Sequence, residues 1–340
     1  DFYQAAALAD ADQEPGLLLR LITAELRDGQ LEAALQRIDE AAFSGSMPVA
    51  DRWRVEWNAA QALQAAGELP RALQRVRLLL ADDTQQAVPT ALDLRLRWLE
   101  AHLSLLAGEV QEVEARVSTL QARLDSLPPG TFDPDEARLL STEVLLLQAE
   151  MLMRRGDFDA ALEALRRLRT DYAQSAAAER SYLTEANYYA AIGDFEAAQA
   201  ILLQLASTYP DSPLAPQALF EAGLYCERRG PESFAEAVRV HHQLTQRYSS
   251  DRLFFFARLK QGDLLRQMND FAGAQIIYED LIKRFPEHPR RYMAELSRAD
   301  CMLALAKEDA EQLKDVALAL EQLIDRPSLP IDFQAEVEKL

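Results

Sequence analysis

The stretch RRGDFDAAL at residues 154–162 returns as AIGDFEAAQ at 191–199, and this recurrence decides the fold of the 340-residue chain. Weaker copies read RRGPESFAEAV at 228–238 and QMNDFAGAQ at 267–275. Spacings of 37, 39 and 37 residues separate the phenylalanine anchors Phe158, Phe195, Phe234 and Phe271. The same spacings separate a second series of aromatic anchors, Tyr172, Tyr209, Tyr248 and Phe285. Two features that share one period indicate internal structural repeats.

Each repeat has the pattern of a helical hairpin. Gly156 and Gly193 suit the left-handed conformation that ends a first helix, and Asp157 and Asp194 are placed to cap a second helix. Small residues that let two helices approach closely follow three positions after each phenylalanine: Ala161, Ala198, Ala237 and Ala274. The sequence therefore predicts antiparallel helix pairs and no strands.

Further copies extend the array over most of the chain. They read DGQLEAAL at 28–35, AGELPRAL at 66–73 and AGEVQEVE at 107–114, and a last copy is expected at 288–325. We therefore expect an all-α fold, an α-solenoid of about eight antiparallel helical hairpins. The expected segments are degenerate repeats at 1–126, a Pro-rich loop or junction at 127–137, regular repeats at 138–325, and the start of a further, truncated helix at 326–340.

The composition excludes several classes of partner. The chain has 36 Lys and Arg against 55 Asp and Glu, a formal charge of −19. Nucleic acids and anionic membrane surfaces require clustered cations, so neither is expected as a partner. No run of eighteen apolar residues occurs, so no transmembrane segment is expected.

The sequence also lacks a recognisable catalytic constellation. It contains no Gly-rich phosphate loop, no Gly-x-Ser-x-Gly elbow and no His-Glu-x-x-His pair. His241 and His242 are adjacent, so on a helix they point about 100° apart, and we expect one interior and one solvated histidine. Cys226 and Cys301 are expected to be small buried hydrophobic residues. We predict a protein that is not an enzyme, with no catalytic residue, cofactor or metal site.

The repeat resembles the tetratricopeptide repeat family. Signature positions of that family for aromatic, small, large apolar and proline residues are occupied by Tyr182, Ala186, Tyr189, Ala198, Leu202 and Pro210. Gly223 and Gly262 match the small-residue position in the next two units, whereas Glu185 and Gln261 stand where the family favours leucine. The resemblance implies a right-handed superhelix whose first helices line a concave surface that binds proteins or peptides.

The longer unit resembles a subgroup of that family. TYPDSPLAPQALFEAG at 208–223, echoed by RFPEHPRRYMAELSRA at 284–299, is similar to repeats of bacterial cell-envelope proteins, including lipoproteins of outer-membrane β-barrel assembly and proteins that accompany the Tol–Pal system. This similarity favours a periplasmic or cell-envelope location over the cytoplasm. The co-chaperone carboxylate clamp of the family is not expected, because Leu183, Phe220 and Leu259 stand where that clamp needs a cation.

A candidate binding surface emerges when positions are compared between repeats. Seven and eight residues after the second aromatic anchor, earlier repeats have polar residues or proline, whereas the last two repeats have Phe255 and Phe256, then Tyr292 and Met293. Cations accompany this apolar ridge at Arg252, Arg258, Arg290 and Arg291. An apolar ridge rimmed by arginine favours a peptide or protein partner with acidic residues, bound on the concave face of the C-terminal repeats.

Other interpretations of the same residues remain open. The four large side chains could fill gaps between tilted repeats, in which case Phe256 and Met293 would both be buried. The array could instead be a structural module that self-assembles through its terminal hairpins. It could also be the recruiting arm of a larger enzyme whose catalytic domain lies outside these 340 residues.

Overall fold

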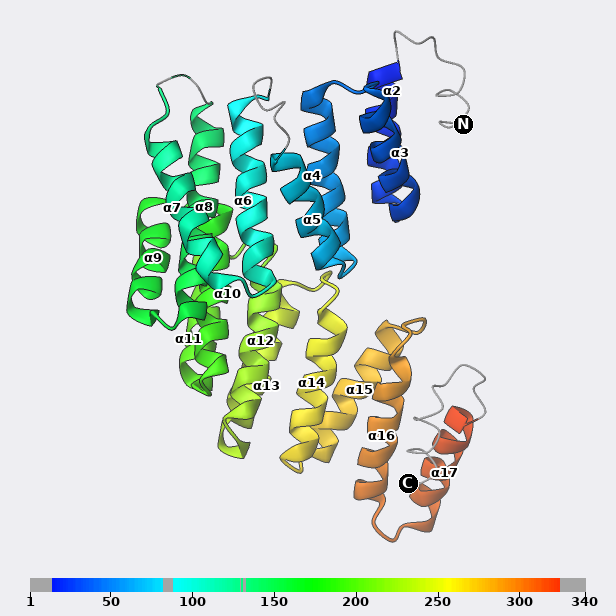
Figure 1. Ribbon diagram of the computed structural model, residues 1–340. Helices are drawn as coiled ribbons and strands as arrows, with labels where there is room; N and C mark the ends of the chain where they lie inside the picture. The colour runs from blue at the N-terminus through cyan, green and yellow to red at the C-terminus, as the bar shows by residue number, and fades with distance from the viewer. Residues whose placement is uncertain (1–13, 82–87, 129, 131–132, 325–340) are drawn as a thin grey trace. The chain divides into compact units, whose positions relative to one another are not determined.

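The structure is a computed structural model that describes residues 14–81, 88–128, 130 and 133–324 (Figure 1). These residues form sixteen α-helices, one short 3-10 helix, η3 (Pro231–Ser233), and no strand. The first helices of the hairpins are α2 (Glu14–Arg27), α4 (Val49–Ala65), α6 (Thr90–Leu106), α8 (Pro134–Arg155), α10 (Ala176–Ala191), α12 (Ala215–Arg228), α14 (Phe254–Gln267) and α16 (Arg291–Ala306). The second helices are α3 (Leu31–Ser44), α5 (Leu69–Leu80), α7 (Val110–Asp125), α9 (Phe158–Asp171), α11 (Phe195–Thr208), α13 (Phe234–Arg247), α15 (Phe271–Arg284) and α17 (Ala310–Ile324).

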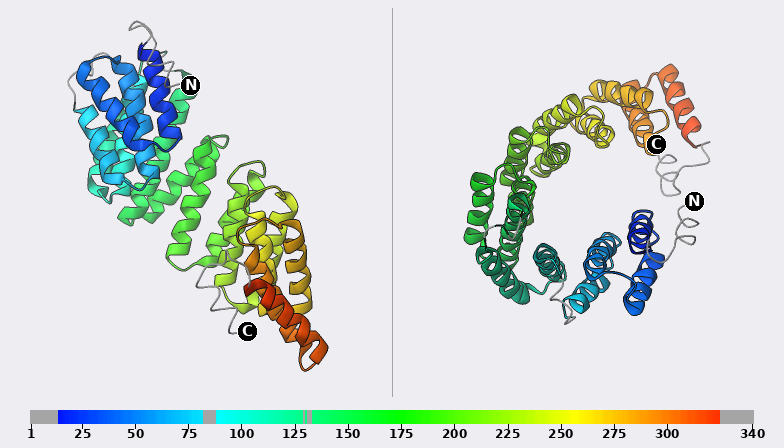
Figure 2. Two further views of the ribbon diagram at one scale, coloured as in Figure 1. Left: turned by 90° about the vertical axis from the view of Figure 1, so that its right-hand side faces the viewer. Right: turned by 90° about the horizontal axis from the view of Figure 1, so that it is seen from above.

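The chain divides into two compact units, residues 1–178 and 179–340, and the division falls in α10. Figure 2 shows that the first and second helices lie in two layers within each unit. Neighbouring first helices also contact each other, as α4 does with α6 and α14 does with α16. The described residues thus confirm the predicted all-α array of eight hairpins.

Each hairpin turn contains a residue with positive φ, which ends the first helix and reverses the chain. These residues are Gly29, Gly67, Gly108, Gly156, Gly193, Gly230, Asn269 and Lys307. The expected cap at Asp194 is present, because its Oδ1 accepts the Ala197 N–H at 3.0 Å. The prediction that the Asp157 side chain caps the second helix was wrong. Its carboxylate pairs with Arg155 at 3.0 Å and makes no capping hydrogen bond.

The predicted close approach of the two helices is confirmed in the core. The alanines three positions after the phenylalanine anchors are all fully buried: Ala161, Ala198, Ala237 and Ala274. Buried small residues also recur at one position of the first helices, at Ser181, Ala218, Ala257 and Ala294. The 37- and 39-residue spacings in the sequence therefore correspond to structurally equivalent positions.

Glycine replaces alanine in the first helix where the second helix carries a ring. In the repeat of α10 and α11, Ala186 and Leu202 lie in one core cluster. At the equivalent positions of the next repeat, a Cβ added to Gly223 would lie 2.3 Å from the ring of His241. In the repeat after that, a Cβ on Gly262 would lie 2.5 Å from the ring of Tyr278. The large ring is accommodated because the facing residue has no side chain.

The Pro-rich interruption of the sequence lies between α7 and α8. Helix α7 ends at Asp125 and α8 begins at Pro134, where the Asp133 carboxylate accepts N–H groups of the first turn. The predicted division into degenerate and regular segments stays a prediction, because it concerns the regularity of the repeats. The helix expected at 326–340 lies outside the described residues. None of the described helices combines the length and apolar character needed to span a bilayer.

Candidate partner-binding surface

The three consecutive phenylalanines at the start of α14 have three different environments. Phe254 and Phe255 are buried, with 4% and 2% of their surface exposed, whereas Phe256 is half-buried. The Phe255 ring stacks on His288 with centroids 3.7 Å apart and meets the edge of Phe285 at 5.8 Å. The prediction that Phe255 belongs to a binding ridge was wrong, because its ring fills the space between α14 and the α15–α16 loop.

Phe256 and Met293 occupy equivalent positions in α14 and α16. Met293 is 37% exposed, and the Arg290 guanidinium lies over the Phe256 ring at 5.3 Å from its centroid. Neither side chain is buried, in contrast to the interpretation in which both fill gaps between repeats. Their role in binding stays a prediction.

Tyr292 lies in a different environment from Phe256. It packs with Leu296 and Leu320 against the buried Leu323 of α17, whereas Phe256 packs against the cluster around Tyr278. Whether Tyr292 also contributes to the ridge stays a prediction, because its side chain is half-buried, as that of Phe256 is. Its side chain contributes to the contact between α16 and α17.

The four predicted arginines fall into two groups. Arg258 pairs with Asp280 at 3.1 Å, and Arg291 pairs with Glu295 at 3.0 Å, so both are engaged within the chain. Arg252 and Arg290 are exposed, and neither makes an ion pair within the described part of the chain. We call the half-buried Phe256 together with the exposed Met293, Arg252 and Arg290 the C-terminal ridge, and their action as one binding surface stays a prediction.

A further cation, Arg284, was not identified when equivalent positions of the repeats were compared. The Arg284 guanidinium lies 4.0 Å from the centroid of the Phe254 ring, and its Nη2 donates to the Ser249 carbonyl at 3.3 Å. Its position directly before the aromatic anchor Phe285 was the available signal. The interaction places another positive charge near the start of α14.

The surroundings of His288 beside this ridge favour its neutral form. Its Nδ1 accepts the backbone N–H of Arg290 at 3.2 Å. Burial and the nearby Arg290 charge lower the pKa of His288 below its ordinary value. A neutral imidazole can stack on Phe255 without the desolvation cost that a buried cation would carry.

A row of paired charges on the first helices was also missed from the sequence. The Glu227 carboxylate of α12 accepts a hydrogen bond from Lys260 Nζ of α14 at 2.9 Å. Its other oxygen lies 3.3 Å from Nε2 of the buried His241. Arg266 of α14 pairs with Asp300 of α16. The residues come from different repeats, so no local motif in the sequence signals the pairing.

Burial and hydrogen bonding shift the pKa values of carboxylates in and beside this row. Desolvation raises the pKa of Glu227, but hydrogen bonds from His241 and Lys260 outweigh it and hold the pKa below the ordinary value. Burial raises the pKa of Asp263 even though the carboxylate accepts the Tyr278 hydroxyl at 2.7 Å. These groups tie α12, α13, α14 and α15 together through interior polar contacts.

The remaining chemistry-bearing residues have structural environments. His241 is buried and His242 is exposed, which confirms the prediction for that pair. Cys226 and Cys301 are fully buried, as predicted. The described residues include no group of three or more His, Cys, Asp or Glu side chains arranged to hold a metal ion.

Comparisons with known proteins agree with this geometry. A family model described as tetratricopeptide repeat matches residues 143–175 and 256–288, and a second model with the same description matches 183–240. No curated protein matches the sequence.

Solved structures share the fold at low sequence identity. The C-terminal part of a TPR repeat-containing protein from Cytophaga hutchinsonii is 11% identical, with a TM-score of 0.52 over 83% of this chain and 98% of that chain. The apo form of the quorum sensor NprR from B. thuringiensis is 12% identical, with a TM-score of 0.51 over 92% of this chain and 89% of that chain. These structures are similar to this chain in their helical architecture.

Proposed function

Because the chain belongs to the tetratricopeptide repeat proteins, we propose that it is a non-enzymatic scaffold that binds an acidic peptide or protein on its C-terminal ridge. Proteins of this fold serve as interaction modules, since stacked repeats present an extended surface. The proposed partner contributes an apolar side chain to Phe256 and Met293 and a carboxylate to Arg290. The location in a bacterial cell envelope suggested by the long repeats stays a prediction.

The observation that carries the proposal is the pair of exposed arginines without ion pairs. The chain carries a formal charge of −19, so carboxylates are abundant. Arg258, Arg266 and Arg291 of the same unit are each paired with a carboxylate of the chain. Arg252 and Arg290 have no such partner among the described residues, so both charges are available to a carboxylate from outside.

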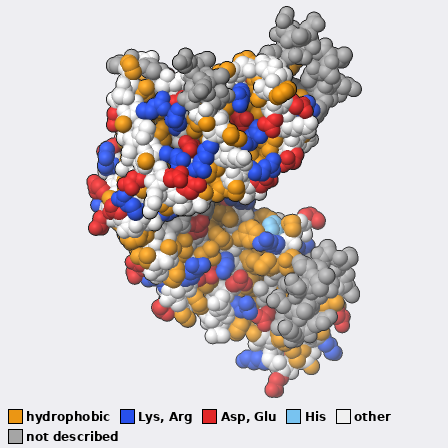
Figure 3. Space-filling view, viewed as in Figure 1, with side chains coloured by type: hydrophobic (Ala, Val, Ile, Leu, Met, Phe, Trp, Pro, Cys, Tyr) orange, Lys and Arg blue, Asp and Glu red, His pale blue; other side chains and the backbone are white. Residues whose placement is uncertain are grey.

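Apolar surface accompanies these charges. Figure 3 shows hydrophobic side chains gathered over α12 and α14. The Arg290 guanidinium lies over the Phe256 ring at 5.3 Å from its centroid, so a positive charge is adjacent to apolar surface. An apolar contact beside a charge-assisted hydrogen bond gives both affinity and orientation to a bound segment.

A peptide array tests the proposal without a known partner. The full chain is applied to peptides in which Asp, Glu, Lys and aromatic residues are varied, and the strongest binders are measured by fluorescence anisotropy. Arg290→Glu should weaken an acidic binder more than tenfold, because it replaces an attraction by a repulsion. Phe256→Ala should weaken it by a similar factor through loss of apolar contact.

Matched substitutions on the second helices serve as controls. Arg239→Glu on α13 and Ile276→Ala on α15 change exposed residues of the same kinds, and each should alter the dissociation constant less than twofold. The proposal fails if acidic peptides bind no better than their lysine counterparts, or if Arg290→Glu binds an acidic peptide as tightly as the wild type does.

Self-association is a second candidate function, favoured by the last hairpin. Leu305 of α16 and Leu318 and Ile324 of α17 are 40%, 54% and 41% exposed. Exposed leucine and isoleucine on a terminal hairpin suit contact with a second copy of the chain. A concentration-dependent molar mass in light scattering, abolished by Leu318→Glu, would support this candidate, and a constant monomer mass would exclude it.

A further inference from the structure

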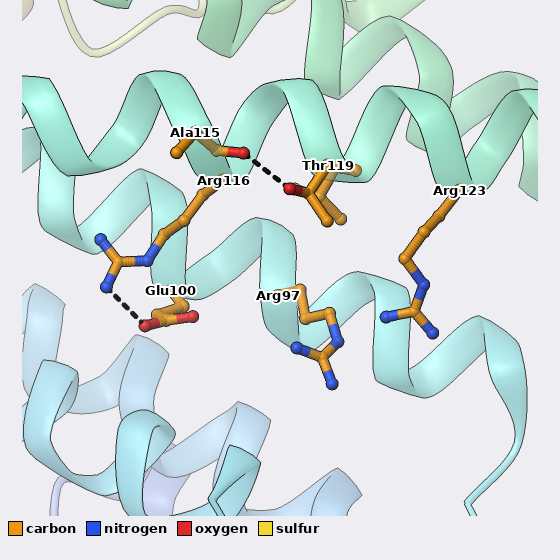
Figure 4. Close-up of a pocket in the computed structure, with 7 residues that line it drawn as sticks. Arg97, Glu100, Ala115, Arg116, Thr119 and Arg123 are labelled. Atoms are coloured by element: carbon orange, nitrogen blue, oxygen red, sulfur yellow. Dashed lines mark hydrogen bonds and ion pairs between the residues drawn. The ribbon is translucent and has the colours of Figure 1, made fainter.

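Many charged side chains of this protein are arranged in arginine–carboxylate pairs. Figure 4 shows one such pair on the hairpin of α6 and α7, where the Arg116 guanidinium extends to Glu100 and lies 3.0 Å from its carboxylate. Such groups keep their charges between about pH 5 and pH 8, whereas histidine changes its charge in that range. One of the four histidines, His288, lies beside the C-terminal ridge.

His288 contacts both helices that form the ridge. Its ring stacks on Phe255 of α14 with centroids 3.7 Å apart, and its centroid lies 5.9 Å from that of Phe256. Its Nδ1 accepts the backbone N–H of Arg290 at 3.2 Å, directly before α16. The imidazole therefore fixes the residue that carries the ridge cation against the helix that carries the ridge aromatic side chain.

The hydrogen bond to His288 requires an unprotonated Nδ1. In the imidazolium form both ring nitrogens are donors, so an Nδ1–H would face the Arg290 N–H where an acceptor is needed. A charged imidazole would also be partly desolvated and close to the Arg290 guanidinium, and these two effects lower the pKa of His288. The folded loop thus disfavours protonation, and by linkage protonation destabilises this arrangement of the loop.

The segments that pack around His288 carry charges of both signs. These charged residues are Asp251 and Arg252 before α14, Arg284 at the end of α15, and Glu287, Arg290 and Arg291 in the loop and at the start of α16. The Arg284 guanidinium lies over the Phe254 ring, and Arg291 pairs with Glu295 at 3.0 Å. Protonation of His288 therefore acts most directly on Arg290, which shares its hydrogen bond.

We propose that His288 is an acid-sensitive switch whose protonation weakens the binding of an acidic partner to the C-terminal ridge. This inference rests on the proposed function of the ridge. Above the ordinary histidine pKa of about 6.5 the neutral ring holds Arg290 beside Phe256. As the pH falls below that value the ring becomes protonated, the Arg290 N–H loses its acceptor, and the guanidinium is no longer held over Phe256. A carboxylate of the partner then binds a less ordered cation, with lower affinity.

Binding of an acidic peptide from the array at pH 7.5 and at pH 5 tests the switch. The dissociation constant of the full chain should rise about threefold at pH 5, because the apparent affinity falls with the fraction of chains in the competent form. Carboxylates of the peptide stay largely ionised at that pH. His288→Asn supplies an acceptor for the N–H two residues on and has no titratable group, so its dissociation constant should rise less than about 1.5-fold.

A matched histidine provides the control. His242→Asn removes an exposed histidine on α13 and should retain the wild-type response to pH. Both variants keep Asp263, so titration of that carboxylate cancels in the comparison. Circular dichroism verifies that each variant is folded at both pH values.

Hydrogen exchange of the Arg290 amide reports on the switch without a partner. Its protection, relative to the intrinsic exchange rate at the same pH, should fall at pH 5 in the wild type and stay unchanged in His288→Asn. If no acidic peptide binds at pH 7.5, the proposed function fails, and the exchange measurement still tests the coupling of His288 to Arg290.

Three results would overturn the switch. They are a wild-type affinity that stays constant or rises at pH 5, a response of His288→Asn equal to that of the wild type, and a protection of the Arg290 amide that does not depend on pH.

Discussion

Adding one methyl group at Gly262 should disrupt the contact between α14 and α15. The new Cβ would lie 2.5 Å from Cε1 of Tyr278, well below normal van der Waals contact. The Tyr278 ring cannot move aside easily, because it is fully buried and its hydroxyl donates to Asp263 at 2.7 Å. Gly262→Ala therefore forces either the ring or the helix to shift.

The expected magnitude follows from two opposing effects. Overpacking of a filled core costs about 3 kcal/mol at the upper end of its usual range. Replacing glycine by alanine within a helix contributes about 1 kcal/mol of stability. The free energy of unfolding of the α14–α15 region should fall by about 2 kcal/mol as the difference of these terms.

A second substitution should relieve the clash. The equivalent pair one repeat before His241 is Ala186 with Leu202, so the structure already contains an alanine facing a leucine. In the background of Gly262→Ala, Tyr278→Leu should cost less than it does in the wild type, because the ring that clashes is removed. A double-mutant cycle measures this coupling, with about 2 kcal/mol expected.

Urea unfolding followed by circular dichroism, combined with hydrogen exchange of α14 and α15, is the suitable assay. Repeat arrays do not unfold as one cooperative unit, so the local exchange rates are needed. Gly16→Ala is the control, since a Cβ there meets no atom within 4 Å and the change should be neutral or stabilising. An unchanged unfolding midpoint and unchanged exchange of α15 in Gly262→Ala would refute the reasoning.

Three further predictions concern charge and burial. Burial raises the pKa of Asp263, so the wild type loses stability when this group deprotonates as the pH rises above about 4, the ordinary aspartate pKa. Asp263→Asn has no such group to deprotonate, so it should gain stability relative to the wild type over the same pH range. Urea midpoints between pH 4 and pH 7 measure this difference. Arg75 pairs with the buried Glu56 carboxylate at 2.8 Å, and Arg75→Ala leaves that carboxylate without a partner. The free energy of unfolding should therefore fall by about 3 kcal/mol, as measured by tryptophan fluorescence in urea. Cys226 and Cys301 should react with Ellman's reagent only after unfolding, because burial raises the pKa of each thiol to about 11.

A specific result would contradict each of these three predictions. The argument about Asp263 fails if the variant and the wild type have parallel pH profiles. Arg166→Ala, which breaks an exposed pair on α9, is the control for Arg75→Ala and should change stability by less than about 0.5 kcal/mol, so equal effects would contradict the role of burial. Rapid reaction of either native thiol would show that its surroundings open readily.

The repeat architecture could be predicted from the sequence because its signals are local and recur. A positive-φ glycine such as Gly193 and a buried alanine such as Ala198 lie within a few residues of each other in every clear copy. The hairpin turn survives even where Asn269 replaces glycine, since asparagine tolerates the left-handed region better than most residues.

The binding surface was harder to predict, because exposure depends on contacts between repeats. Comparison of equivalent positions identified Phe255 and Phe256 as unusual, but it could not show that His288 from the next loop covers Phe255. The pairing of Glu227 with Lys260 joins residues 33 positions apart, so it too follows from packing and not from a local pattern. Side-chain burial between repeats is therefore the information that the repeat pattern lacks.

The matched glycine and ring within one hairpin bear on how such arrays can be rearranged. Gly223 and His241 belong to the same helix pair, so a duplicated or transplanted hairpin carries its own fitted interior. The polar links run differently, since Glu227 of α12 meets Lys260 of α14 in the next hairpin. A hairpin of this chain should therefore keep its interior packing when it is moved within an array. The ion pairs between successive hairpins should instead depend on which hairpins are neighbours.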